Sequence, residues 1–152
     1  MERLFRHILV PVDGSEPALA AVRVALRLRA ASPDCELTAL YVVDKLVLHE
    51  LIRFSARGER EVGAELEEQA HRYLDFIQAE AARDGATVSV QTRKGDPFEE
   101  IIAVANALPA DLIVMGHTGR RGTARVLVGS VTQRVLDYAP CPVLVTRSNS
   151  AS

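Results

Sequence analysis

The chain has 152 residues, a length that fits one domain with a core of its own and no need for a disulfide or a structural metal. Hydrophobic residues make up 48% and charged residues 25% of the chain, and the net charge of −2 excludes a strongly basic nucleic-acid-binding protein. The apolar runs are too short to span a bilayer and no signal peptide precedes the first strand-like run, so a cytoplasmic protein without a membrane segment is expected.

The first three expected elements are a strand, a helix and a strand. The β-branched run 7–12 stops at Asp13-Gly14-Ser15, which is typical of a buried parallel strand that ends in a turn. Ser15 is placed to cap a helix over 18–31, a segment rich in alanine and leucine. The second strand is expected over 36–43.

The middle of the chain is expected to hold a long connection, a long helix and an edge strand. Residues 44–60 lose a clear hydrophobic period, so we predict a connection with one short helical turn, and connections of this length are often functional. An amphipathic helix is expected over 61–83, ended by Gly85. The alternation of apolar and polar residues over 86–93 predicts a strand near the sheet edge.

The last third of the chain contains two further helix and strand pairs. Asp96 is placed to cap a helix over 97–107. The other expected elements are a strand over 112–115, a glycine-rich loop from 116 to about 125, a helix over 130–138 and a strand over 143–146. A single domain is expected over 1–147, followed by a polar tail over 148–152.

This regular alternation of strands and helices predicts the fold class. We expect an α/β fold with an open, doubly wound, five-stranded parallel sheet of Rossmann-like type, strand order 3-2-1-4-5, and helices on both faces. In such sheets ligands bind outside the carboxyl ends of strands where the winding reverses. The loops after the first and the fourth strand are therefore the expected binding loops.

The loop after the fourth strand carries the strongest functional signal. Two residues separate Gly116 from Gly119, and nine residues separate Gly119 from Gly129, which Ser130 follows at the start of a helix. Glycine lets backbone N–H groups approach an anion closely, and a helix start favours phosphate. The loop matches neither a Walker A loop nor the dinucleotide-binding Gly-x-Gly-x-x-Gly motif, and glycines also occur in loops for purely structural reasons.

The spacing Gly-x2-Gly-x9-Gly-Ser resembles the phosphate-binding signature of the ATP-binding branch of the universal stress protein family. The resemblance extends to the segments 8–15, 111–116, 129–131 and 140–145, and so covers nearly the whole chain. Together these segments are far more specific than the glycines alone.

The resemblance implies a role for each of ten residues in nucleotide binding. Asp13 resembles the carboxylate that binds the ribose hydroxyls, although an Asx turn or a helix cap would equally explain an aspartate there. The other residues form the adenosine walls and the phosphate cradle: Pro11, Val12, Val42 and Met115 on the adenosine side, and Gly116, Gly119, Gly129, Ser130 and Val131 around the phosphates.

The implied ligand is ATP, with ADP or AMP as alternatives, and Mg²⁺ accompanying the nucleotide. The implied assembly is a homodimer joined through the last strand, and the implied function is regulation of the stress response through an unidentified partner protein. Two alternatives remain: a slow ATPase or other nucleotide-processing enzyme, and a nucleotide-free interaction module. The chain has no P-loop lysine or kinase-like Asp/Asn set, so efficient turnover is not predicted.

Six further residues have charged or reactive side chains but no predicted role in the site. His117, Arg120, Arg121 and Arg125 lie in the glycine loop and either contact phosphate or are solvated charges. Cys35 and Cys141 have no metal-ligand spacing, which favours reduced thiols.

Overall fold

The computed structural model describes residues 4–118 and 128–147, and the strands in this part of the chain form one five-stranded parallel sheet in the order β3-β2-β1-β4-β5. This architecture confirms the predicted fold. The strands are β1 (His7–Val12), β2 (Glu36–Asp44), β3 (Ser89–Gly95), β4 (Leu112–Gly116) and β5 (Val143–Thr146). The helices are α1 (Glu16–Ala31), α2 (Lys45–Arg53), α3 (Glu59–Arg83), α4 (Pro97–Ala107) and α5 (Ser130–Tyr138).

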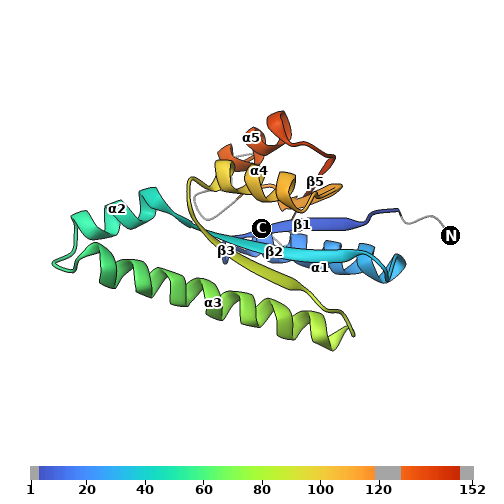
Figure 1. Ribbon diagram of the computed structural model, residues 1–152, viewed down its shortest axis with the longest axis horizontal. Coiled ribbons are helices and arrows are strands. Elements are labelled where there is room, and N and C mark those ends of the chain that lie inside the picture. The colour runs from blue at the N-terminus through green and yellow to red at the C-terminus, as the bar shows by residue number, and fades with distance from the viewer. Residues whose placement is uncertain (1–3, 119–127, 148–152) are drawn as a thin grey trace.

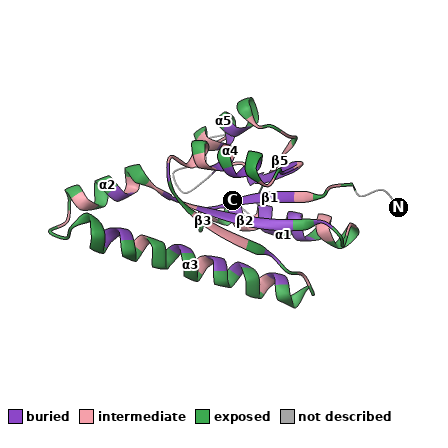
Figure 2. Ribbon diagram, in the orientation of Figure 1, coloured by how far each residue is buried: buried purple, intermediate pink, exposed green. Residues whose placement is uncertain are grey.

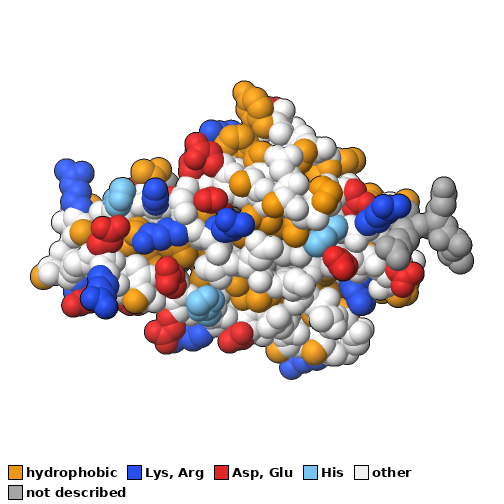
Figure 3. Space-filling view, in the orientation of Figure 1, with side chains coloured by type: hydrophobic (Ala, Val, Ile, Leu, Met, Phe, Trp, Pro, Cys, Tyr) orange, Lys and Arg blue, Asp and Glu red, His pale blue; other side chains and the backbone are white. Residues whose placement is uncertain are grey.

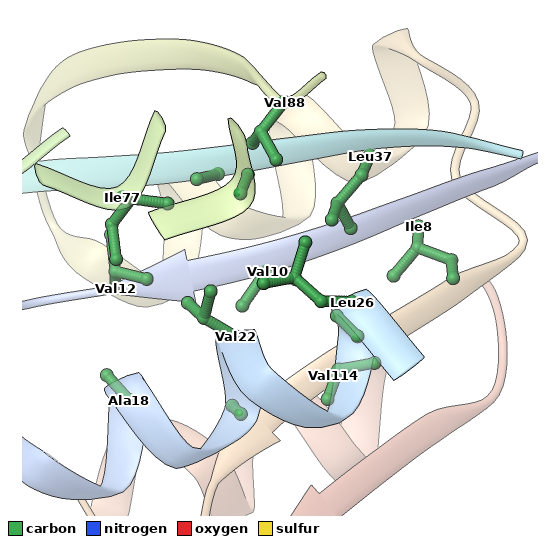
Figure 4. Packing of buried hydrophobic residues seen from close by; sticks show 14 of the residues in the cluster. Ile8, Val10, Val12, Ala18, Val22, Leu26, Leu37, Ile77, Val88 and Val114 are labelled. Carbon is green, nitrogen blue, oxygen red and sulfur yellow. The ribbon is translucent and has the colours of Figure 1, made fainter. Parts of the chain in front are cut away.

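Helices cover both faces of the sheet (Figure 1). On one face, α1 and α3 pack on alternate residues of the central strands, and Figure 4 shows Val22 and Leu26 of α1 against Val10 of β1. On the other face, α4 and α5 cover Leu9, Leu40 and their neighbours. The central strands are buried from both sides, which Figure 2 shows as purple arrows. This is why β1, β2 and β4 read as continuous apolar runs in the sequence.

The predicted helix ends are confirmed by their capping contacts. The Ser15 hydroxyl accepts a hydrogen bond from the backbone N–H of Ala18 at 3.3 Å, and Asp96 accepts one from Glu99 at 3.0 Å. Gly85 ends α3 in the left-handed region, at φ 68°.

The prediction of a long connection over 44–60 is wrong, because α2 occupies nine of these residues. Asp44 caps α2 by accepting a hydrogen bond from the Leu46 N–H at 2.9 Å. Leu48 is fully buried and the helix packs on α3. The exposed Leu46 obscured the helical period, because it lies on the opposite side of the helix from the buried Leu48.

The remaining differences from the predicted elements are at their ends. Helices α1 and α3 begin two residues earlier than expected, and β2 and β4 each extend one residue further. Strand β3 begins at Ser89 rather than at residue 86 and continues to Gly95, because its pairing with β2 runs from Thr38 to Asp44. Strand β3 is an edge strand, as expected.

The surface carries charges of both signs. Figure 3 shows acidic and basic side chains interspersed on one face, in keeping with the net charge of −2. In residues 4–118 and 128–147, no helix has the length and apolar character needed to cross a membrane.

Candidate functional site

A cavity of about 590 Å³ opens at the carboxyl ends of β1, β2 and β4, where the winding direction of the sheet reverses. Each predicted site residue that the structure describes lines it. Gly119 lies outside the described residues, as do Arg120, Arg121 and Arg125 of the glycine loop. The predicted residues at the cavity are Pro11, Val12, Asp13, Val42, Met115, Gly116, Gly129, Ser130 and Val131.

One side of the cavity is apolar. Val42 follows the buried part of β2, and Met115 is buried near the end of β4. Ile101 of α4 and Val47 of α2 complete this wall. A flat aromatic base fits such a wall because apolar pockets with few polar groups are the usual binding sites for small ligands.

Asp13 stands at the end of β1, where its carboxylate lines the cavity. Its Oδ1 accepts a hydrogen bond from the backbone N–H of Ser15 at 3.0 Å, so the Asx turn is formed. A carboxylate has about four acceptor positions, so it can accept from a turn N–H and from a ligand hydroxyl together. The structural role and the ribose role are therefore compatible at this residue.

Several cavity residues were not predicted from the sequence. Asp44 ends β2, and a carboxylate at the end of a strand is the same signal that selected Asp13. Pro97 and Ile101 come from α4, and Thr132 comes from α5. These three have no distinctive local signal, because only packing of the helices brings them to the cavity.

The first turn of α5 presents open backbone donors to the cavity. Gly129 is the N-cap, no side chain among the described residues caps the helix, and no acidic residue lies in the first turn. The first intrahelical bond runs from the Gln133 N–H to the Gly129 carbonyl at 2.9 Å. The N–H groups of Ser130, Val131 and Thr132 therefore precede the helical bonding pattern, and the helix dipole adds positive potential there. This arrangement favours an anion.

Gly116 and Gly129 are glycines for different physical reasons. A Cβ at Gly116 would lie 2.6 Å from the carbonyl carbon of Pro17, so close packing of α1 requires glycine there. Gly129 has φ −67° and ψ 158°, a conformation that any residue adopts. Its backbone does not require glycine, and glycine places no side chain of its own beside the first N–H groups of α5.

Residues at the two ends of the glycine loop are held together by backbone hydrogen bonds. The His117 N–H donates to Thr146 of β5 at 2.9 Å, and the Gly129 N–H donates to the His117 carbonyl at 2.6 Å. His117 does not line the cavity, and its Nδ1 is buried with no hydrogen-bond partner among the described residues. Thr118 is buried and does line the cavity.

A pair of tyrosines lies beside the carboxylate end of the site. Tyr41 lines the cavity, and the ring of Tyr73 meets it edge-on with centroids 6.0 Å apart. Burial, followed by the nearby carboxylate of Asp13, raises the pKa of Tyr73 to about 12. The phenol therefore stays protonated at physiological pH.

The two cysteines are free thiols outside the cavity. Cys35 is buried and Cys141 is half-buried. Burial, and then the charge of Asp111, raises the pKa of both thiols, so their thiolate forms are disfavoured. In the part of the chain that the structure describes, no three histidine, cysteine or acidic side chains gather into a metal-binding group.

Comparison with known proteins decides the family. The model of the universal stress protein family matches residues 4–147. The chain belongs to the universal stress protein family. Universal stress protein MJ0531 of Methanocaldococcus jannaschii is 37% identical over 147 residues, which cover 96% of this chain and 84% of that relative.

Solved structures of universal stress proteins share the fold. Protein MJ0577 of the same organism superposes with a TM-score of 0.84 at 29% identity, and the match covers 97% of this chain and 99% of the other. A universal stress protein solved in complex with cAMP superposes with a TM-score of 0.68 at 25% identity, covering 95% of this chain and 98% of the other. The family resemblance seen in the sequence is thus confirmed.

Proposed function

We propose that this universal stress protein binds ATP in the cavity at the carboxyl ends of β1, β2 and β4, and that bound nucleotide regulates its interaction with a partner protein in the stress response. The observation that carries the proposal is the open first turn of α5, which faces the same cavity as Asp13. A cavity with anion donors and a sugar-binding carboxylate suits a nucleotide.

The cavity offers a group for each part of a nucleotide. The apolar wall around Val42 and Met115 takes the base, and Asp13 accepts hydrogen bonds from the ribose hydroxyls. The N–H groups of Ser130 and Val131 donate to phosphate oxygens, with the Ser130 hydroxyl as a further donor. Gly119 is proposed to belong to the same cradle on the strength of the glycine spacing.

The nucleotide class is supported by a relative. The universal stress protein solved with cAMP holds an adenine nucleotide on the same fold. We favour ATP over ADP and AMP because the glycine spacing resembles that of the ATP-binding branch. Mg²⁺ would enter with the triphosphate, because this ion keeps several waters and binds mainly through phosphates.

The proposed activity is regulation by binding within a single domain over 1–147. Nucleotide contacts to α5 and to Asp44 at the start of α2 would shift the population of conformations at these helices, and a partner would recognise the shifted surface. Slow hydrolysis of ATP is the enzymatic alternative.

We further propose a cytoplasmic homodimer joined through β5. This strand is at the sheet edge, and its Leu144 is 39% exposed. Leu136 and Tyr138 of α5 are also exposed. Edge strands with exposed apolar residues need covering, and a second copy of β5 would provide it.

The decisive experiment is calorimetric titration of the nucleotide-stripped protein with Mg-ATP. Mass spectrometry of the released nucleotide precedes it, and phosphate release in the same samples measures hydrolysis. A dissociation constant in the micromolar range, about −8 kcal/mol, supports the proposal. If the protein neither binds ATP nor purifies with a nucleotide, the nucleotide-free interaction module replaces it.

A further inference from the structure

Side chains of α5 contact both the end of β4 and the start of α4. Open N–H groups bind an anion well only when the structure keeps them oriented before the ligand arrives. The residues that hold this turn are therefore as relevant to affinity as the donors themselves. Two of them, Thr132 and Arg134, lie outside the glycine spacing.

Thr132 joins α5 to the end of β4. Its hydroxyl donates a hydrogen bond to the carbonyl of Gly116 at 3.0 Å, and the side chain is 3% exposed. Removing the hydroxyl would leave a buried carbonyl without this donor. Gly116 is the last residue of β4, so this bond ties the first turn of α5 to the carboxyl end of that strand.

Arg134 joins α5 to the start of α4. Its guanidinium carbon lies 4.1 Å from the centre of the Phe98 ring, a cation–π contact. Its Nη1 lies 3.9 Å from Oδ1 of Asp96, the N-cap of α4. The Phe98 ring also meets Tyr138 of α5 edge-on at 5.7 Å. Arg134 thus packs the two helices together beside the cavity, but does not line it.

We propose that Thr132 and Arg134 are positioning residues that set the affinity for the phosphate part of the nucleotide. This inference rests on the proposed ATP binding. Thr132 fixes α5 relative to the sheet and Arg134 fixes it relative to α4, so the donors of Ser130 and Val131 are oriented from two sides. The residues proposed to take the adenosine part come from β1, β2, β4, α2 and α4, and neither Thr132 nor Arg134 is among them.

The test compares ATP with adenosine, because a general loss of structure would weaken both ligands equally. Titrations are run on the parent, Arg134→Ala, Arg134→Lys and Thr132→Val, with Thr132→Ser as the variant that keeps the hydroxyl. Arg72→Ala is the control, because Arg72 is exposed on α3 and away from the cavity. Thermal melting confirms that each variant is folded.

We expect Arg134→Ala to weaken ATP about two- to fivefold and Thr132→Val about five- to tenfold, with adenosine affinity unchanged. Thr132→Ser should bind ATP as tightly as the parent, because serine keeps the hydroxyl. Arg134→Lys should have an affinity between those of the parent and Arg134→Ala, because lysine lacks the planar guanidinium group. Equal losses for ATP and adenosine, or unchanged ATP affinity, would overturn the positioning role. A parent that binds no ATP would instead overturn the proposed function itself.

Discussion

Replacing Gly129 with aspartate should stabilise the nucleotide-free protein and abolish nucleotide binding. Gly129 is an N-cap without a side-chain bond, and its φ and ψ suit aspartate. The new carboxylate would accept from the open N–H groups of α5 and interact favourably with the helix dipole. It would therefore occupy the position proposed for phosphate.

The substitution should raise the stability of the nucleotide-free protein and remove the stabilisation by ATP, and the size of each effect can be estimated. A better cap contributes a few tenths of a kcal/mol over glycine, and the dipole adds about 0.3–1 kcal/mol. For a chain of this size the sum raises the melting temperature by about 1–5 °C. ATP at 100 times its dissociation constant stabilises the parent by about 2.7 kcal/mol, or roughly 5–10 °C, and this increase should vanish in the variant.

Thermal melting with and without Mg-ATP measures both quantities in one assay. Gly58→Asp is the matched control, because Gly58 is also an N-cap without a side-chain bond and a Cβ there meets nothing within 4 Å. This control should melt at or above the parent temperature and still respond to ATP. The reasoning fails if Gly129→Asp melts lower than the parent without nucleotide, or if ATP stabilises it as much as the parent.

Four other changes test separate parts of the structure. Asp13→Asn keeps the Oδ1 acceptor of the turn but removes the charge, so calorimetry should show ATP affinity about tenfold weaker with little change in melting; unchanged affinity would exclude the ribose contact. Gly116→Ala should cost about 1–3 kcal/mol in urea unfolding because its Cβ would meet Pro17, and a neutral result would contradict the packing reason. The folded-state pKa of Tyr73 is raised from 10 to about 12, so its contribution to the free energy of unfolding is present below pH 10 and lost as the pH rises through 12. Tyr73→Phe should therefore lose less stability over this pH range than the parent. Equal losses in the parent and the variant would refute this role of Tyr73. If the parent sediments as the proposed dimer, Leu144→Lys on β5 should shift it to a monomer, and an unchanged dimer would place the interface elsewhere.

The secondary structure of this protein follows largely from local sequence. The β-branched runs of β1 and β4, the cap at Ser15 and the left-handed Gly85 act within a few residues, so they were predicted correctly. The open parallel sheet with helices on both faces followed from the alternation of strands and helices, because parallel strands are joined by crossover connections. The strand-end Asp13 and the glycine spacing also pointed to the cavity that the structure contains.

Features that depend on contacts between distant segments required the tertiary structure. Helix α2 escaped prediction because the exposed Leu46 hides the helical spacing of Val47, Leu48 and Ile52, and only the packing against α3 shows which side is buried. The close approach of Pro17 to Gly116, and the hydrogen bond from Thr132 to that same glycine, join residues far apart in the chain. Local preferences decide which segments become helices and strands, whereas the shape of the cavity is decided by how those elements pack.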